Sequence, residues 1–419
     1  MAYFTGAATD YFSGVVMNNY YIFSNGVDKV QYWDGSASQV SILPGCENYS
    51  ARTLGKFGER VVLFYTVESG TAYPQTVRWS VAGGVSTPPD ADDWSETGSG
   101  YTDLESFMPE DFIMNAEKLG AYYIIYGEKS IILMDYQAQV STPFAFYARV
   151  PRQGLLARRA VVNLGNSHIF LGHDNVYSYE GGKEVIPIGN KIRDELFSII
   201  DPTYAGSSFF SYKQEGEDVR LYIPLLGNTT PNHYFLYNLR NKSWARGGRS
   251  ATGWGTYKAV DALTWDSHPS TWNQAVGRWN DVTTSDLTPA LMYGNDSGEI
   301  FKDTEIVHDI AGTAIDGYHD TKDFVTGDGY RRDGTNWFCL YFEGWGDAVS
   351  LQYSVDFGAT WSTATDYTLS STWARYRYDF EAWYPQIRFR FRNNTQGETF
   401  QVRHFELGYI DTSDRGIDA

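Results

Sequence analysis

Hydrophobic and polar positions form short hairpin-like blocks along most of the chain. Each block is an apolar run of strand length, a tight turn rich in Gly, Asn or Asp, and a second strand-like run that often ends in Trp or Tyr. The blocks start roughly 40–70 residues apart, near the spacing of β-propeller blades. Six blocks cover residues 20–35, 61–79, 122–135, 168–182, 219–244 and 290–304. The pattern predicts an all-β fold, with an irregular β-propeller of about six blades over residues 1–305.

The pattern changes near the end of these blocks. Residues 306–329 are polar and rich in Gly and Asp, which predicts a linker. Strand-like runs then follow at close intervals, and they predict a C-terminal antiparallel β-sandwich over residues 330–419. In one of these runs apolar residues alternate with Arg388, Arg390 and Arg392, so the three arginines share one face of the strand.

Three stretches depart from the strand pattern. Residues 189–200 carry apolar side chains at helical spacing, which predicts a short helix. Residues 80–117 contain nine carboxylates and no Lys or Arg, and we expect a long excursion between blades there. Residues 252–289 hold four Trp residues among polar ones, a composition that argues against simple disorder.

Composition and charge narrow the classes of partner. The 419-residue chain is 42% hydrophobic and 16% aromatic, which suits a large β-rich core. Its formal net charge of −18 argues against general adhesion to nucleic acid or to an anionic membrane. We expect no signal peptide, because the N-terminus has neither a basic region nor a long apolar run. We also expect no membrane span, because the sequence has no apolar stretch of 18 residues. The two cysteines, Cys46 and Cys339, are interpreted as free buried thiols in a reducing compartment.

One short motif fits the Asp-box pattern SxDxGxTW, which occurs in sialidase-like propellers. Its Asp can accept hydrogen bonds from the turn's own amides, its Gly tolerates a positive φ, and its Trp packs beneath the turn. A glycosidase site is one interpretation. We favour a turn staple, because the single box lies outside the repeated blocks. Its residues are Ser354, Asp356, Gly358, Thr360 and Trp361.

Charged residues gather in several places. The acidic stretch offers four carboxylates, Asp90, Asp92, Asp93 and Glu96. Because calcium-loop spacing is absent, we favour a solvated or partner-facing loop over a metal site. Two basic clusters are either solvated faces or protein interfaces, since arginines and aromatics anchor interfaces. The first cluster contains Arg149, Arg152, Arg158 and Arg159, and the second contains Arg240, Lys242, Arg246 and Arg249. The row Arg388, Arg390 and Arg392 suits an interface or a polyanion.

No motif in the sequence proposes catalysis. We find no HExxH, no nucleophile elbow, no P-loop, no dinucleotide fingerprint after a strand and no zinc-ligand spacing. These absences leave a catalytic triad or a carboxylate pair open, but nothing in the sequence proposes either one. We expect a protein that is not an enzyme and that holds no cofactor or metal.

The order of four segments resembles the β-propeller tail hub or nozzle proteins of short-tailed bacteriophages, also called packaged-DNA stabilisation proteins. The segments are residues 23–35, 75–94, 168–197 and 353–362. The resemblance implies six copies in a ring below the portal and adaptor, which continues the DNA channel, retains the genome and opens for ejection. It implies tail fibres or spikes as neighbours and double-stranded DNA that passes through without sequence-specific binding.

We therefore expect a structural virion protein of the tail that is assembled in the host cytoplasm as a homohexamer. A negative lumen would let DNA move without sticking, because like charges repel. The main alternative is a glycan-binding or sialidase-like receptor-recognition tail protein, supported by the Trp-rich stretch and the Asp box. A second alternative is an intracellular propeller adaptor that recruits peptides.

Overall fold

A computed structural model describes most of the chain, which divides into two compact units, Met1–Asp303 and Thr304–Ala419. The residues that it describes are 4–7, 9–137, 142–214, 216–257, 290–303, 309–310, 313–325, 336–384 and 386–410. Almost all of their regular structure is β-strand, so the predicted all-β class is confirmed.

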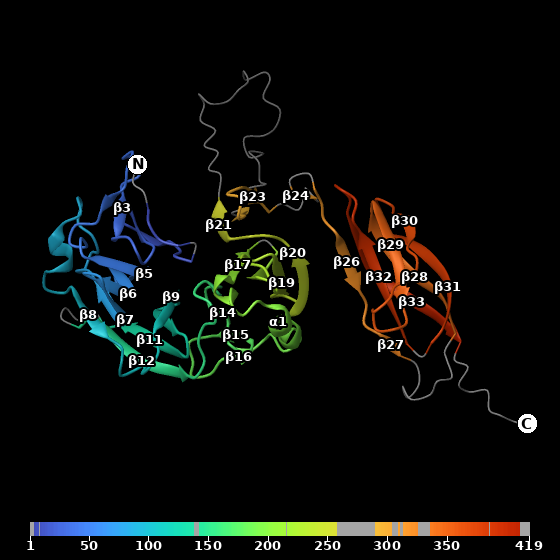
Figure 1. Ribbon diagram of the computed structural model, residues 1–419, viewed down its shortest axis with the longest axis horizontal. Helices are drawn as coiled ribbons and strands as arrows, with labels where there is room; N and C mark the ends of the chain where they lie inside the picture. The colour runs from blue at the N-terminus through green and yellow to red at the C-terminus, as the bar shows by residue number, and fades with distance from the viewer. Residues whose placement is uncertain are drawn as a thin grey trace, which may run out of the picture. The chain divides into compact units, whose positions relative to one another are not determined.

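Six antiparallel sheets follow one another in chain order within the described part of the N-terminal unit (Figure 1). The first sheet contains β1 (Ser13–Met17), β2 (Tyr20–Ser24), β3 (Gln31–Trp33) and β4 (Ser41–Ile42). The second contains β5 (Tyr49–Phe57), β6 (Arg60–Glu68), β7 (Thr71–Trp79) and β8 (Gly100–Asp103). The third contains β9 (Ile113–Leu119), β10 (Tyr122–Gly127), β11 (Ser130–Tyr136) and β12 (Phe144–Pro151).

The remaining three sheets of this unit have the same consecutive order. The fourth contains β13 (Val161–Asn163), β14 (His168–Leu171), β15 (Val176–Tyr179) and β16 (Ile186–Pro187). The fifth contains β17 (Phe209–Lys213), β18 (Asp218–Ile223), β19 (His233–Asn238) and β20 (Ser243–Gly248). The sixth has three described strands, β21 (Gly253–Tyr257), β22 (Ala290–Gly294) and β23 (Ile300–Lys302).

The repeated sequence blocks correspond to inner hairpins of these sheets. Residues 122–135, for example, form β10 and β11, which pair from Tyr123↔Met134 to Tyr126↔Ile131. In each of the six sheets the block supplies the second and third strands. The apolar runs and tight turns of the sequence therefore locate one hairpin in every sheet.

A hydrophobic core lies between each pair of successive sheets. In β6, Val61 and Leu63 pack with Ile22 of the first sheet. The alternate residues Val62 and Phe64 pack on the opposite face in a core shared with the third sheet. Burial on both faces explains why strands such as β6 read as continuous apolar runs rather than alternating ones.

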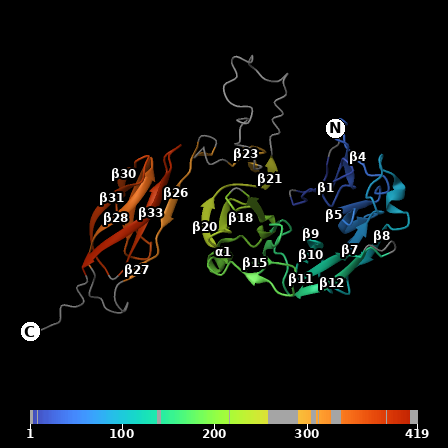
Figure 2. The same cartoon turned by 180° about the vertical axis from the view of Figure 1, so that it is seen from behind.

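The first strands of successive sheets lie side by side. β1 contacts β5, β5 contacts β9, β9 contacts β13, β13 contacts β17 and β17 contacts β21. Figure 2 shows β1, β5 and β9 from behind. Arg159 and Phe209 form an isolated parallel bridge between the segments that enter β13 and β17. Side chains near the starts of different first strands can therefore meet.

Helical structure is sparse in the described chain. The stretch predicted as a short helix contains α1 (Arg193–Ile199), which confirms the prediction, and Leu196 is buried in the core between the fourth and fifth sheets. Two short 3₁₀ turns are η1 (Ala91–Trp94) and η2 (Ala205–Ser207). Among the described residues no helix is long and apolar enough to span a bilayer.

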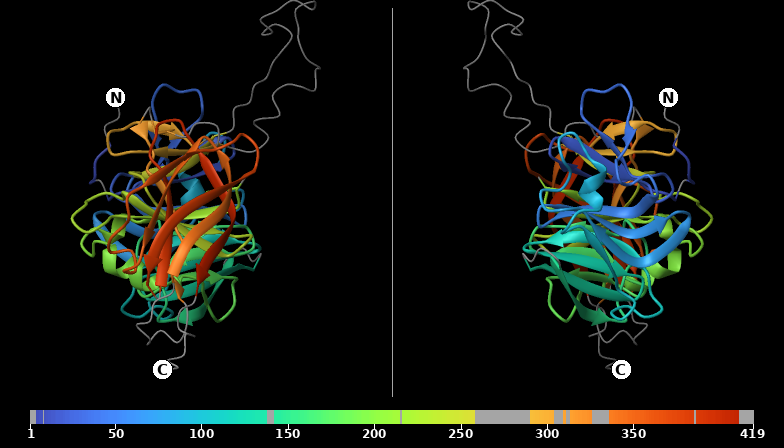
Figure 3. Two further views of the ribbon diagram at one scale, coloured as in Figure 1. Left: turned by 90° about the vertical axis from the view of Figure 1, so that its right-hand side faces the viewer. Right: turned by 90° about the vertical axis from the view of Figure 1, so that its left-hand side faces the viewer.

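Within its described residues, the C-terminal unit contains two larger sheets and one small hairpin, β24 (Asp309–Ile310) with β25 (Thr313–Ala314). One sheet has the order β26 (Gly317–Asp320), β32 (Gln386–Asn393), β29 (Ala348–Ser354) and β30 (Thr365–Thr368), with β27 (Phe324–Val325) also paired to β32. The other has the order β31 (Ala374–Trp383), β28 (Asn336–Gly346) and β33 (Phe400–Ile410). The strands of both sheets are the orange-to-red ribbons of Figure 3.

The two sheets of the C-terminal unit share a core. Leu340 and Phe342 from β28 pack with Ile387, Phe389 and Phe391 from β32. The alternation expected for this last strand is confirmed, because its arginines lie on the opposite face from its buried apolar side chains. Part of the stretch predicted as a linker, residues 306–329, belongs to this unit, since β26 and β27 pair with β32.

Candidate functional site

Arg159 lies just before β13 of the fourth sheet, and its side chain contacts residues at the starts of the first strands of three other sheets. Its guanidinium lies 3.6 Å from the ring centroid of Tyr11, just before β1, and 4.9 Å from that of Phe209 on β17. Its Nη1 donates a 2.8 Å hydrogen bond to the carbonyl of Thr252, just before β21. The sheets at the two ends of the series are thus linked through one side chain.

Two more arginines belong to the same group. Arg158 interacts electrostatically with Arg52, Arg159, Asp10 and Tyr11. Arg52 comes from β5 and lies 4.1 Å from the ring centroid of Tyr65. The side chains of all three arginines, of Asp10 and of Tyr11 are half-buried. We call Asp10, Tyr11, Arg52, Arg158 and Arg159 the arginine cluster.

The charges in the arginine cluster are not balanced. Burial, followed by the like charges of Arg52 and Arg159, lowers the pKa of Arg158 from 12.5 to about 10. Asp10 is the one carboxylate among these five residues, and one of its oxygens already accepts a 2.7 Å hydrogen bond from the Ala7 amide. The cluster therefore holds three guanidinium groups against a single carboxylate, at sites partly shielded from water.

The other predicted basic residues lie in different settings. Arg149 on β12 is half-buried, whereas Arg152 is exposed just beyond that strand. Arg246 on β20 pairs with Glu195 of α1. Arg249 lies 3.5 Å from a carboxylate oxygen of Asp303. The two sequence clusters thus do not form two surfaces, and only Arg158 and Arg159 come together.

A buried ion-pair group joins the fifth and sixth sheets. Asp303 lies 2.7 Å from Arg220 and 4.0 Å from Lys213, in addition to its contact with Arg249. The side chains of Asp303 and Arg220 are about one-tenth exposed. Asp303 is thus the counter-charge for buried cations across the junction of the two sheets, and this accounts for Arg249 as a structural residue.

The arginine row of β32 is neutralised within the C-terminal unit. Arg388, Arg390 and Arg392 each make two hydrogen bonds to one carboxylate, those of Asp323, Asp320 and Asp316 respectively, at 2.6 to 3.0 Å. Such fork-to-fork contacts occupy the edge of each guanidinium that would meet a phosphate. The row therefore presents no uncompensated charge to a polyanion.

The Asp-box residues form a compact turn after β29. Asp356 accepts hydrogen bonds from the amide of Thr360 at 2.8 Å and from its hydroxyl at 2.6 Å. These bonds and one from Ser354 lower the pKa of the Asp356 carboxyl to about 2. Gly358 has a φ of +88°, in the region that favours glycine. The ring of Trp361 lies 3.9 Å from the guanidinium of Arg390.

The four acidic candidates surround a 3₁₀ turn and play unequal roles. Asp90 caps η1, while Asp93 is buried and accepts hydrogen bonds from Ser86 and from the Asp90 amide. Asp92 and Glu96 are exposed. No group of three or more potential metal ligands is found among the described residues.

A set of buried polar side chains lies between the third and fourth sheets, and no sequence motif predicted it. The Tyr126 hydroxyl lies 2.9 Å from Nδ1 of His168, whose Nε2 lies 3.0 Å from the Lys118 carbonyl. Burial lowers the pKa of His168 to about 4, and it raises the pKa of Glu117 on β9 to about 7. In both side chains desolvation thus favours the neutral form.

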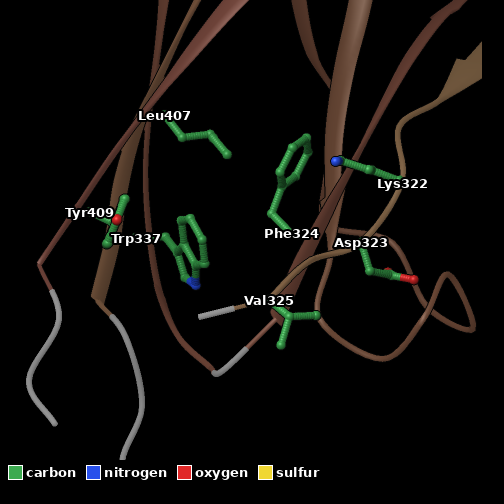
Figure 4. A pocket seen from close by; sticks show the side chains of 7 residues that line it. All are labelled: Lys322, Asp323, Phe324, Val325, Trp337, Leu407 and Tyr409. Atoms are coloured by element: carbon green, nitrogen blue, oxygen red, sulfur yellow. The ribbon is translucent and has the colours of Figure 1, made fainter. Parts of the chain in front are cut away.

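The C-terminal unit has an open groove of about 400 Å³. In Figure 4 the side chains of Phe324, Trp337 and Leu407 converge there. Tyr409 lies 5.2 Å from Trp337 between ring centroids. The Trp337 Nε1 donates to the Tyr384 carbonyl at 2.8 Å, so its polar edge is occupied. Lys322 and Asp323 also line the groove, so its lining combines aromatic and apolar side chains with charged ones.

The Trp-rich stretch, residues 252–289, lies largely outside the described residues, from 258 onward. Both cysteines, Cys46 and Cys339, are free and buried, as expected. The residues that sequence reasoning missed are Asp10, Tyr11 and Arg52 of the arginine cluster. No local motif marks them, because they meet only through the packing of first strands.

Comparisons with known proteins do not assign a family. No protein-family description and no curated protein matches the chain. Among solved structures, the computationally designed protein Ika8 is similar over 69% of each chain, with 10% identity and a TM-score of 0.35. An exo-β-1,3-galactanase from Phanerochaete chrysosporium matches over 94% of this chain and 81% of its own, with 10% identity and a TM-score of 0.27. Likenesses this low carry no argument about fold or function.

Proposed function

We propose that the chain is a structural subunit of a bacteriophage tail. In this proposal its N-terminal unit is an irregular six-bladed β-propeller, and copies assemble, six to a ring, into a nozzle or hub that extends the DNA channel below the portal and adaptor. The ring retains packaged DNA and opens for ejection. The subunit has no catalytic role, and it is incorporated in the virion tail after assembly in the host cytoplasm.

The order of the sheets supports the propeller. Six consecutive antiparallel sheets share cores with their neighbours, and their first strands contact one another in sequence. Strands of this kind cannot bury their faces alone, and a closed series buries both faces of every sheet. Val16 and Tyr21 of the first sheet and Ile300 of the sixth are exposed apolar residues at the two ends of the series. Arg159, which reaches Tyr11 and Thr252, would hold these ends together.

The pairing of arginines is the observation that carries the DNA-conduit proposal. Most described arginines are bound to carboxylates of the same chain, including the whole row on β32. Phosphate affinity depends on free cations that displace counterions. A chain with a net charge of −18 and internally neutralised arginines offers DNA few such contacts, which suits passage without adhesion.

The test is retention of the genome. Phage particles assembled without this protein should form filled heads that then lose their DNA, because the channel is not closed below the adaptor. Adding the purified protein to such particles should restore protection of the DNA from nuclease. Particles that lack the protein and yet keep a full, nuclease-resistant genome would contradict the proposal.

The groove of the C-terminal unit favours a second candidate, glycan binding during receptor recognition. Aromatic side chains such as Tyr409, half exposed at the groove, are suited to stack on sugar rings. A glycan array probed with the wild type and with Tyr409→Ser would decide. Binding that the substitution abolishes would support this candidate, and an array without signal would remove it.

A further inference from the structure

We propose that the arginine cluster is a binding site for a small oxyanion of the phosphate class, held by the guanidinium groups of Arg52, Arg158 and Arg159. This inference does not depend on the proposed tail function. It concerns a site inside one N-terminal unit, at the starts of the first strands.

Several hydrogen-bond donors of the arginine cluster have no partner among the described residues. Neither Arg52 nor Arg158 makes a hydrogen bond or ion pair with any residue that the structure describes, although both are half-buried. In Arg159 the Nε is buried and lacks a partner, while Nη1 is bound to Thr252. Buried donors normally have partners, so the unpaired Nε of Arg159 is costly. An oxyanion would satisfy several of these N–H groups at once.

The contrast with other arginines is the second argument. Elsewhere this acidic chain provides a carboxylate for most described arginines, even exposed ones such as Arg377 with Asp379. At the arginine cluster, no carboxylate of the described residues forms an ion pair with Arg52, Arg158 or Arg159, and the groups that favour their charged forms are Asp10 and Tyr11. Like charges in a partly desolvated place repel unless a counter-charge is supplied. A bound dianion would supply it.

Aromatic contacts hold two of the three guanidinium groups, those of Arg52 and Arg159, in place. Arg52 lies over the ring of Tyr65 at 4.1 Å, and Arg159 lies over that of Tyr11 at 3.6 Å from the centroid. Stacking uses the planar face of a guanidinium and leaves its N–H edge available. These two guanidinium groups are thus held in place before any ligand arrives, which favours affinity. Because Arg52 lies on β5 and Arg158 and Arg159 lie just before β13, a bound anion would also join the second and fourth sheets.

Thermal unfolding and calorimetric titration of the full chain with sodium phosphate would test the site. The reference is sodium chloride at equal ionic strength. We expect phosphate to raise the unfolding temperature, since a ligand present at about 100 times its Kd favours the folded state about 100-fold. Arg158→Gln and Arg52→Gln should each weaken phosphate binding on the order of tenfold or more. Arg158→Lys, which keeps the charge but loses the fork, should have an intermediate effect.

Arg152→Gln is the matched control, because it removes the same charge from an exposed neighbouring position and should leave phosphate binding unchanged. In chloride alone, Arg158→Gln should be at least as stable as the wild type, because it relieves repulsion. This readout separates loss of the ligand from loss of the fold. Equal responses of the wild type and Arg158→Gln to phosphate, or no response of the wild type, would overturn the proposal. Stabilisation by duplex DNA without any by phosphate would overturn it as well.

Discussion

At the residue scale, Glu117 on β9 links protonation to stability. Burial raises the pKa of its carboxyl from 4.5 to about 7, so the folded protein binds this proton more tightly than the unfolded chain does. The favourable contribution is complete below pH 4.5 and is lost as the pH rises through about 7. A glutamine at this position has no charge to lose.

We therefore predict that Glu117→Gln gains stability over the wild type as the pH rises from about 4.5 to about 8. Because the side chain keeps some contact with water, we discount the full linkage value and expect a gain of about 1–2 kcal/mol. Urea unfolding at several pH values measures it. Glu105→Gln, at an exposed position, serves as the control. A difference between Glu117→Gln and the wild type that stays constant across this range would contradict the assignment.

Asp356 gives a second prediction at this scale. Its depressed pKa means that the carboxylate stabilises the turn above pH 3.8 and that this contribution is lost as the pH falls through about 2. Asp356→Ala should lower the unfolding temperature of the C-terminal unit at neutral pH, because the bonds from Thr360 and Ser354 are removed. Asp366→Ala, which removes the bond from Ser350, should lower it less. Calorimetry compares the two, and an equal or larger effect of Asp366→Ala would be inconsistent with the turn staple.

At the scale of elements, Asp303 holds the fifth and sixth sheets together. Replacing it with Asn would leave the guanidinium groups of Arg220 and Arg249 buried without their counter-charge. We predict that Asp303→Asn lowers the free energy of unfolding by about 3–5 kcal/mol. Glu217→Gln, which breaks the exposed pair with Arg240, should cost less than about 1 kcal/mol. Similar costs for both variants in urea unfolding would rule out this role for Asp303.

The pairing of β26 with β32 is also testable. Arg390 is held between Asp320 and the rings of Tyr318 and Trp361. A double-mutant cycle of Arg390→Ala and Asp320→Ala should give a coupling of about 1 kcal/mol, because both side chains are mostly buried. The exposed pair Arg377 and Asp379 should give less than about 0.5 kcal/mol. A coupling energy no larger than that of this control would show that Asp320 does not neutralise Arg390 of the β32 arginine row.

The strands and the faces of their side chains could be predicted from local sequence, whereas the residues that contact one another across different strands could not. The hairpins were predictable because tight turns and apolar runs lie next to each other in the chain, and the helix at 193–199 because its spacing is local. A first strand such as β13 is only three residues long, so its hydrophobic pattern is too short to predict it from sequence. The carboxylates of the arginine row lie 65 to 76 residues away, in a stretch interpreted as a linker. Arg52 and Asp10 likewise reach Arg158 only through packing.

For the whole molecule, the proposed nozzle function requires that several subunits assemble into a ring. A subunit of the proposed nozzle should form rings, and in such a ring the charge of −18 would keep the channel walls repulsive to DNA. The contacts between subunits would involve surfaces other than the arginine row, whose charges are already paired. Exposed carboxylates such as Asp92 and Glu96 remain candidates for such contacts.

Electron microscopy of the purified full chain, alone and mixed with the phage portal and adaptor complex, would distinguish a ring-forming subunit from a monomer. We expect rings of six subunits, either free or formed on the adaptor, with an open central channel. Particles that stay monomeric in both preparations and leave the adaptor complex unoccupied would contradict the proposed nozzle function.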